Sequence, residues 1–202
     1  MSALTELYAQ INACQRCEIA KRRTKAVPGE GPENAEIMFI GEAPGWHEDQ
    51  QGRPFVGPAG QYLDQLLASI GMKRTEVYIT NVIKTRPPDN REPLPHEIAN
   101  CRPYLERQIE IIRPRIIVTL GRYSMAMFFP GKSISKIHGT ARKEGGVFYF
   151  AMYHPAAALH QGNLRQEIEK DIRKLPALLA EARATSASPQ PPQSQAQQLN
   201  LF

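Results

Sequence analysis

Four short apolar runs, separated by segments with the spacing of helices, constrain the fold of this chain more than any other feature. The runs cover residues 37–40, 77–83, 115–120 and 147–152. Their length, their β-branched residues and the glycines or loops beside them are typical of buried strands. Helices between successive strands imply right-handed crossovers and parallel pairing. We therefore predict a three-layer α/β/α domain with a central, mostly parallel sheet of four strands.

Proline and glycine mark the ends of the predicted helices. One helix begins at Pro58 and stops at Gly71, and a long one begins at Pro95 and ends before Pro114. A last helix is predicted over about residues 164–182, whereas residues 131–146 are expected to form a basic loop. These elements assign residues 1–183 to one domain, which is long enough to bury a core.

Composition limits the compartment and the partners. The net charge of +5 and the pI of about 9.2 mildly favour an anionic partner such as nucleic acid. No apolar run approaches the ~18 residues of a membrane span, and the first residues lack the pattern of a signal peptide. We expect a cytoplasmic monomer that does not bind membranes.

The connection after the first strand is the strongest candidate for a functional loop. Residues 41–60 read GEAPGWHEDQQGRPFVGPAG, many more than the ~2–6 residues that usually join a strand to a helix. Glu42, Glu48 and Asp49 supply carboxylates, Phe55 offers a flat apolar face, and the glycines let backbone N–H groups approach a ligand. An acidic cluster alone would fit a solvated loop, but its combination with glycine and an aromatic residue indicates a binding site.

Four candidate site residues lie at or just after the carboxyl ends of the predicted strands. They are Glu42, Asn81, Gly121 and His154. Ligands of parallel α/β proteins bind beyond these ends, so residues distant in sequence can share one pocket. Taken alone, Asn81 would fit a structural amide, and His154 would fit a capping or core histidine. Their common position predicts a site instead.

The cysteines favour a metal centre over disulfides. Cys14 and Cys17 form a CxxC pair at the end of a predicted short helix, which is a frequent arrangement of metal ligands. Cys101 lies in the long helix, and an odd number of cysteines in a cytosolic chain argues against a disulfide framework. Three inert thiols are the alternative.

Taken in order, the motifs resemble those of the family 4 uracil-DNA glycosylases. They are GEAPGxxED, GRPFVGxAG, YITNVxKxRPP, a long helix with a cysteine, and YHPAAxL, over roughly residues 10–180. That family has a parallel-sheet α/β fold, carries an iron–sulfur cluster and excises uracil from DNA. The resemblance implies a base-excision repair enzyme that flips uracil out of DNA, hydrolyses its N-glycosidic bond and leaves an abasic site.

The resemblance assigns roles to individual residues. Phe55 corresponds to the aromatic residue on which uracil stacks, and Asn81 corresponds to the amide that reads the uracil edge. Glu42 and His154 correspond to the acid of the GExPG motif and the histidine of the HP motif. This histidine, or a loop N–H near Ala43, would stabilise negative charge on the departing uracil. A carboxylate would position water, and all three acids of the loop remain candidates for that role.

The resemblance also implies a [4Fe-4S] cluster held by four cysteines. Three of the positions are Cys14, Cys17 and Cys101, but the fourth, in a KCRPP segment of the family, is Thr85 in this chain. Threonine is a poor iron ligand. A cluster with one ligand that is not cysteine, a labile cluster, and three structural thiols without iron all remain open.

DNA contacts are expected from one apolar and several basic side chains. Leu159 is the candidate wedge that fills the gap left by the flipped base, with a core leucine as the alternative. Arg86 and Arg91 are candidates for phosphate contacts, which position a protein without reading sequence. Further basic residues could serve in the same way: Lys21, Arg22, Arg23, Lys84, Lys136, Arg142 and Lys143.

Two other functions are compatible with the motifs. A non-catalytic iron–sulfur module that binds DNA would keep the fold, although it would not need Glu42, Asn81 and His154. A glycosylase for another deaminated base would keep the pocket and change the substrate.

Residues 184–202 are rich in Ser, Pro, Gln and Ala, which predicts a disordered tail. The tail ends in QLNLF, which resembles the QLxLF peptide by which bacterial repair and replication proteins bind the sliding clamp. Apolar side chains at the end of a polar tether suit a partner groove, although they could also pack on their own domain. The expected contact residues are Gln198, Leu199, Leu201 and Phe202.

Overall fold

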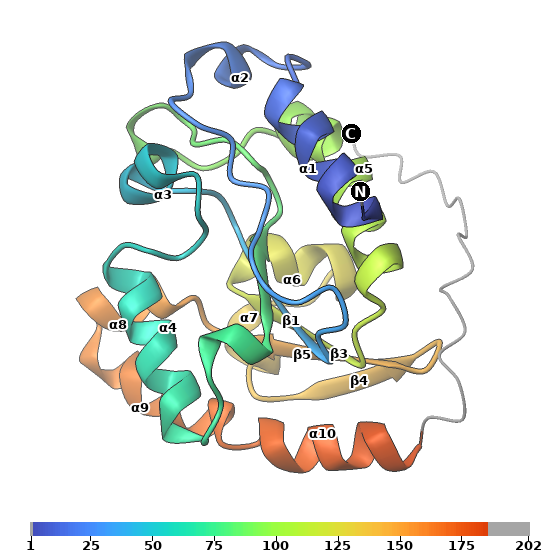
Figure 1. The fold of residues 1–202 in the computed structure, drawn as a ribbon. Coiled ribbons are helices and arrows are strands. Elements are labelled where there is room, and N and C mark those ends of the chain that lie inside the picture. The colour runs from blue at the N-terminus through green and yellow to red at the C-terminus, as the bar shows by residue number, and fades with distance from the viewer. Residues whose placement is uncertain (1, 186–202) are drawn as a thin grey trace.

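A computed structural model describes residues 2–185, in which a five-stranded sheet forms the centre (Figure 1). The order across the sheet is β2–β1–β3–β5–β4. The first four of these strands run parallel, and β4 is antiparallel to β5. The strands are β1 Ile37–Gly41, β2 Tyr78–Asn81, β3 Ile116–Leu120, β4 Ala141–Glu144 and β5 Val147–Met152. The predicted α/β architecture with a mostly parallel sheet is confirmed.

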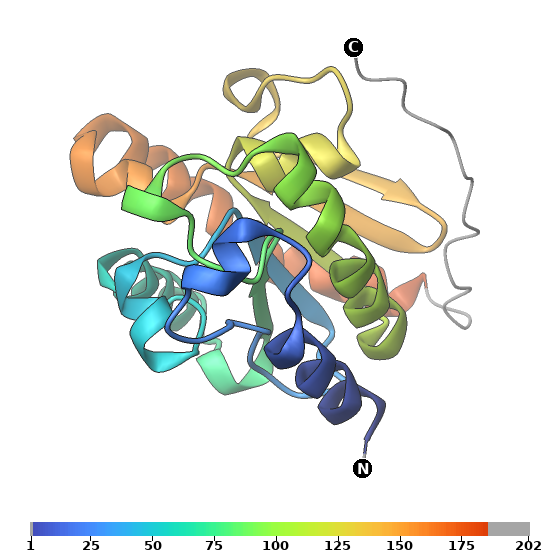
Figure 2. The same ribbon diagram turned by 90° about the horizontal axis from the view of Figure 1, so that it is seen from above.

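Helices cover both faces of this sheet. They are α1 Ala3–Ala13, α2 Glu18–Arg22, α3 Trp46–Gln51, α4 Pro58–Ser69, α5 Pro95–Ile112, α6 Arg122–Phe128, α7 Ile134–Ile137, α8 Pro155–His160, α9 Gly162–Ile172 and α10 Leu175–Ala184. Short 3₁₀ turns lie at Arg74–Glu76 and Pro88–Asn90. Helices α1, α5 and α6 pack on one face, and α4, α9 and α10 pack on the other. Seen from above, α1 and α5 lie side by side (Figure 2).

Strand β1 shows why the chain has two cores. Met38 and Ile40 point into the core beneath α1 and α5, whereas Ile37 and Phe39 point into the core beneath α4 and α9. Successive side chains of a strand alternate between faces, so a strand covered on both sides must be apolar throughout. This explains why the strand was recognisable as an unbroken apolar run.

The sheet has one strand more than predicted, because residues 131–146 are not only a loop. They contain α7 and the edge strand β4, whose four residues are all exposed. A glycine pair at 145–146, with positive φ at both residues, turns the chain back into β5. The exposed sequence Ala-Arg-Lys-Glu has no apolar face, so hydrophobic patterning could not reveal it.

The predicted last helix is in fact two helices, α9 and α10, which are separated at Arg173 and Lys174. Pro176 occupies the first turn of α10. A proline lacks the N–H that an uninterrupted helix would need there, and its ring crowds the preceding turn. The break follows from this single residue.

The strand register brings the predicted site residues to one edge of the sheet. Gly41, the last residue of β1, pairs with Asn81, the last residue of β2. Leu120 of β3 pairs with Met152 of β5. Residues that directly follow these strands therefore meet at the carboxyl edge, as the ligand-binding rule for parallel sheets requires.

Within residues 2–185, no helix combines the length and apolar character needed to cross a membrane. The predicted tail at 184–202 lies outside the described residues except for 184 and 185, and the QLNLF peptide lies outside them entirely.

Candidate active site

Three of the predicted site residues come together at the carboxyl edge. The rings of Phe55 and His154 stack with centroids 5.5 Å apart and planes inclined by 29°. A Cβ atom on Gly41 would lie 2.4 Å from Asn81 Oδ1 and 2.6 Å from Phe55 Cζ. The missing side chain of Gly41 thus allows the amide and the ring to approach each other over the end of β1. Phe55, Asn81 and His154 therefore lie close together at the strand ends.

Asn81 carries an acceptor without a partner. Its side chain is 1% exposed, and Oδ1 is one of two buried polar side-chain atoms in the described residues that make no hydrogen bond. Burying such a group costs about 1–3 kcal/mol unless it is hydrogen-bonded. An unpaired amide oxygen beside an aromatic ring suits a planar ligand that donates an N–H group.

His154 is held as a neutral hydrogen-bond donor. It is the N-cap of α8, where its Nδ1 accepts a hydrogen bond from Ala156 N at 3.1 Å. An Nδ1 that accepts leaves the proton on Nε2. Burial lowers the pKa of His154 from 6.5 to about 4, although the Glu48 carboxylate acts in the opposite direction. The imidazole is therefore neutral near pH 7 and can donate from Nε2.

Two of the three loop acids support the backbone. The Glu48 carboxylate accepts hydrogen bonds from Val56 N and Gly57 N, both at 2.9 Å, and from Gly45 N at 3.1 Å. Both oxygens of Asp49 accept from Thr24 N, at 3.0 and 3.2 Å. Both side chains are buried. Their oxygens are committed to fixing the loop.

Glu42 differs from these two acids. It directly follows β1, is half-buried, and its carboxylate has no hydrogen-bond partner among the described residues. Burial raises the pKa of Glu42, Glu92 raises it further, and Arg122 lowers it. The next residue, Ala43, is also half-buried, and no group of residues 2–185 accepts a hydrogen bond from its N–H. The loop therefore presents one free carboxylate and one free backbone donor side by side in the chain.

A buried polar network supports Asn81 from below. Lys84 Nζ donates to Asn81 O at 2.6 Å, to Thr80 Oγ1 at 2.7 Å and to Gln108 Oε1 at 2.7 Å. Gln108 Nε2 donates to Tyr78 OH at 2.8 Å, and Tyr78 OH lies 2.7 Å from Tyr8 OH of α1. Its position among basic loop residues predicted that Lys84 is a possible phosphate contact. That interpretation is wrong, because the Lys84 side chain is 1% exposed.

The three cysteines approach one another between α1, α2 and α5. Cys14 and Cys17 are half-buried and Cys101 is buried. Burial raises the pKa of the Cys101 thiol, Lys84 lowers it, and the neighbouring Cys17 and Cys14 raise it further. Thr85 is also buried, and its Oγ1 accepts a hydrogen bond from Arg23 Nη1 at 3.1 Å. In residues 2–185, no three His, Cys, Asp or Glu side chains are arranged to hold a metal ion. The residues present do not fit a four-thiolate cluster.

The residues predicted to contact DNA differ in their exposure and in their hydrogen-bond partners. Leu159 on α8 is 48% exposed and is one of three large exposed hydrophobic residues in the described range. Arg91 is paired with Glu97 through both terminal nitrogens, at 2.7 and 2.9 Å. Arg86 donates from Nε to Asn90 Oδ1 at 2.6 Å. Lys21 and Arg23 line a cavity of about 730 Å³ beside α1, and none of Phe55, Asn81 and His154 is among its lining residues.

Sequence comparisons relate this chain to known proteins. Residues 28–175 match the sequence profile of the Uracil DNA glycosylase superfamily. The chain belongs to this superfamily. It is 49% identical to the Type-4 uracil-DNA glycosylase of Sulfurisphaera tokodaii, over 87% of this chain and 84% of that one. It is 45% identical to the Type-4 enzyme of Archaeoglobus fulgidus, over 92% and 98% of the two chains. A Type-5 uracil-DNA glycosylase of Pyrobaculum aerophilum is 32% identical over 65% of this chain.

Within this uracil-DNA glycosylase fold, two charged residues near the site were not recognised from the sequence. Arg74 precedes β2 and contacts the backbone of Phe55. Lys84 follows β2 and contacts the backbone of Asn81. A lysine directly after the apolar residues Val82 and Ile83 is a weak sign of burial. Nothing in the sequence around Arg74 indicates its contact.

Proposed function

We propose that this uracil-DNA glycosylase excises uracil from DNA, which is the activity named for its Type-4 relatives. The observation that carries the proposal is the unpaired Oδ1 of Asn81 beside the Phe55–His154 stack. A base inside a duplex cannot reach this position, so the enzyme must turn the nucleotide out of the helix. The flipped base then stacks on Phe55.

Base recognition follows from the two ends of the Asn81 amide. Oδ1 accepts a hydrogen bond from uracil N3–H, and Nδ2 donates one to uracil O4. Cytosine presents the reverse pattern, an acceptor at N3 and a donor at N4. With cytosine in the site, Asn81 Oδ1 would stay buried without a hydrogen bond. The cost of that unpaired oxygen favours uracil over cytosine.

Bond cleavage leaves negative charge on the uracil ring and positive character on the sugar. The neutral His154 donates from Nε2 to the carbonyl oxygen where the negative charge develops, and we assign an assisting role to the Ala43 N–H. Glu42 is the free acid of the loop, so we assign it the positioning of water and stabilisation of the sugar. Glu48 and Asp49 act on the loop backbone.

The cysteines take no part in this chemistry. Type-4 relatives are consistent with an iron–sulfur family, but the Arg23–Thr85 hydrogen bond stands where a fourth thiolate would be needed. We propose that Cys14, Cys17 and Cys101 have a structural role in this chain. None of the steps above uses iron.

Contacts outside the pocket complete the proposal. Leu159 is exposed enough to enter the base stack as a wedge. Arg86 would contact phosphate. A DNA substrate also implies a cytoplasmic enzyme at the nucleoid. The QLNLF sequence would bind the sliding clamp weakly and hold the enzyme near replicated DNA.

Strand cleavage at abasic sites tests the function. Purified protein is incubated with oligonucleotides that carry a single uracil, thymine, cytosine or hypoxanthine, and alkali then cuts any abasic site. We expect cleavage of the uracil strand alone. Cleavage of the hypoxanthine strand would favour a different deaminated base, and binding without cleavage of any strand would favour the non-catalytic module.

A further inference from the structure

The backbone at Phe55 has a conformation that its side chain does not favour. Its φ is 50°, in the left-handed region that residues other than glycine rarely occupy. A Cβ atom on Gly60 would lie 1.8 Å from Phe55 O, so the absence of that side chain makes room for the turn. Gly60 permits the conformation but cannot enforce it. Strained backbone persists only where surrounding contacts determine it.

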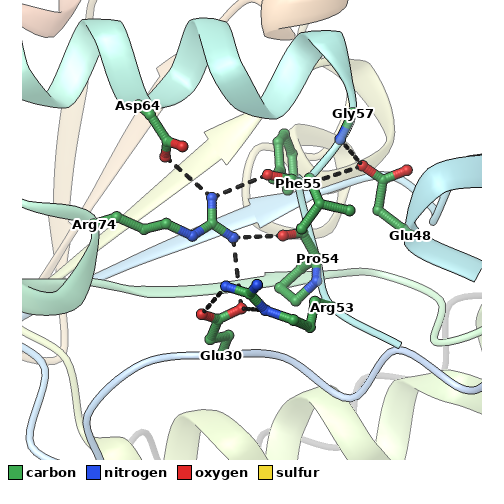
Figure 3. Close-up of polar contacts among 9 residues, drawn as sticks. Glu30, Glu48, Arg53, Pro54, Phe55, Gly57, Asp64 and Arg74 are labelled. Atoms are coloured by element: carbon green, nitrogen blue, oxygen red, sulfur yellow. Dashed lines mark hydrogen bonds and ion pairs between the residues drawn. The ribbon is translucent and has the colours of Figure 1, made fainter. Parts of the chain in front are cut away.

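Arg74 supplies such contacts on the carbonyl side. Its Nη1 donates to Phe55 O at 3.0 Å, and its Nη2 donates to Pro54 O at 2.5 Å (Figure 3). Two successive carbonyls thus face the planar fork of one guanidinium, a geometry that lysine cannot reproduce. The Arg74 side chain is only 18% exposed. Water therefore competes little for these two carbonyls.

Two acids hold Arg74 in this position. Asp64 of α4 accepts from Nη1 at 3.1 Å, and Glu30 lies 3.7 Å from Nη2 (Figure 3). Arg74 is the first residue of the 3₁₀ turn that leads into β2. Arg74 therefore connects α4 to the segment that leads into β2, the strand that ends at Asn81.

Glu48 supplies the contacts on the amide side. Its Oε1 accepts from Val56 N and Gly57 N, both at 2.9 Å. The peptide unit between Phe55 and Val56 therefore has a cation at its carbonyl and a carboxylate at its N–H. Opposite charges at the two ends of one peptide dipole fix the orientation of its plane, and with it the direction of the Phe55 ring.

We propose that Arg74 and Glu48 form a charge clamp that positions Phe55 for stacking against the flipped base. The inference rests on the proposed function, in which Phe55 is the stacking residue. Neither clamp residue touches the base. Their effect passes through the backbone of Phe55, and through its ring to His154, which it contacts at 5.5 Å between centroids.

Arg53 provides a matched control for Arg74. It binds the same acid, with Nε and Nη2 donating to Glu30 at 2.9 and 2.7 Å, but it does not contact the Phe55 carbonyl. Arg74→Met and Arg53→Met remove the same charge beside the same carboxylate. Steady-state kinetics on a uracil oligonucleotide should show that Arg74→Met lowers kcat/KM by about 10- to 100-fold, as a small displacement of a positioned group does. Arg53→Met should stay within about 2-fold.

A double-mutant cycle separates positioning from general destabilisation. If Arg74 acts through Phe55, Arg74→Met should cost little in a protein that already carries Phe55→Ala. Thermal unfolding of each variant shows whether it is folded at the assay temperature. If Arg74→Met is not folded there, Arg74→Lys takes its place, because it keeps the charge but cannot serve both carbonyls. Its loss should be partial and should also vanish with Phe55→Ala.

Three outcomes count against the clamp: equal kcat/KM for Arg74→Met and Arg53→Met, full additivity with Phe55→Ala, or full activity of Arg74→Lys when that variant is the one assayed. Failure of the proposed function has a different signature, since the unmodified protein would then cut no uracil strand at all.

Discussion

His154 should stay neutral well below the pH at which an ordinary histidine becomes charged. Burial lowers its pKa to about 4, and Nδ1 is already occupied as an acceptor. At pH 5.5, a histidine with a pKa of 6.5 is ~90% protonated, whereas one with a pKa of 4 is ~3% protonated. Donation from Nε2 should therefore persist in mildly acid solution.

The same shift has a consequence for folding. The unfolded chain takes up a proton at His154 near pH 6.5, whereas the folded protein does so only near pH 4. The contribution of this residue to stability is fully present above pH 6.5 and is lost as the pH falls towards 4. At 1.36 kcal/mol per pH unit, the loss amounts to about 3 kcal/mol over the whole range and about 2 kcal/mol by pH 5.

Nitrogen NMR of labelled histidine measures both the tautomer and the pKa directly. The chain has five histidines, and His154→Gln identifies the resonance of interest. Urea unfolding at pH 7 and pH 5 measures the stability term. The wild-type protein should lose about 2 kcal/mol more than His154→Gln between these two conditions.

Titration of His154 near pH 6.5, or a proton on Nδ1 in the folded protein, would refute the reasoning. In either case the imidazole could not be the neutral donor assigned to it. Equal pH dependence of unfolding for the two proteins would show that burial does not exclude the charged form.

Four further predictions concern the other residues. Asn81→Ala should reduce uracil excision by at least about 100-fold because the base loses its amide contact. Asn100→Ala, which removes an α5 amide that donates to Arg16 O at 3.3 Å, should act like wild type in the same cleavage assay. Since burial raises the pKa of Glu42 above 4.5, kcat/KM should fall as the pH drops through that raised pKa, and Glu42→Gln should have low activity without this acid limb. Iron analysis after anaerobic purification should find no stoichiometric iron in the wild type, and Thr85→Cys should raise the iron content; a full cluster in the wild type would contradict the structural role of the thiols. A protein ending at Gln197 should lose micromolar binding to the sliding clamp of its own organism but keep its activity on short oligonucleotides; equal clamp binding by both proteins would dismiss the peptide.

The sequence was sufficient to predict the meeting of Asn81 and His154 because strand ends in a parallel sheet obey a simple rule. Each residue lies near the end of an apolar run, and the carboxyl edge of the sheet brings such residues together whatever their distance in the chain. The α/β class could be predicted for the same reason. Strand β4 could not, because a fully exposed edge strand carries no hydrophobic pattern.

The different roles of the three loop acids could not be predicted. Glu42, Glu48 and Asp49 have the same chemistry and lie within eight positions of one another. What separates them is the tertiary partner of each carboxylate, such as Thr24 for Asp49. The role of Lys84 was missed for a similar reason. A charged side chain in a loop is usually solvated. The three buried acceptors of Lys84 come together only in the folded protein.

The network beneath Asn81 links the evolution of distant positions. Lys84 and Gln108 share a buried hydrogen bond, and each also holds other groups that would be left unpaired without it. A lineage that replaced the lysine alone would remove its donor from the Asn81 carbonyl and leave the Gln108 oxygen with only the 3.4 Å hydrogen bond from Thr80 Oγ1. Change at one of these positions should therefore be accompanied by change at the other. Through the tyrosine pair, this constraint extends to Tyr8 on the first helix. Part of the selection that acts on base recognition at Asn81 should therefore also act on the N-terminal helix.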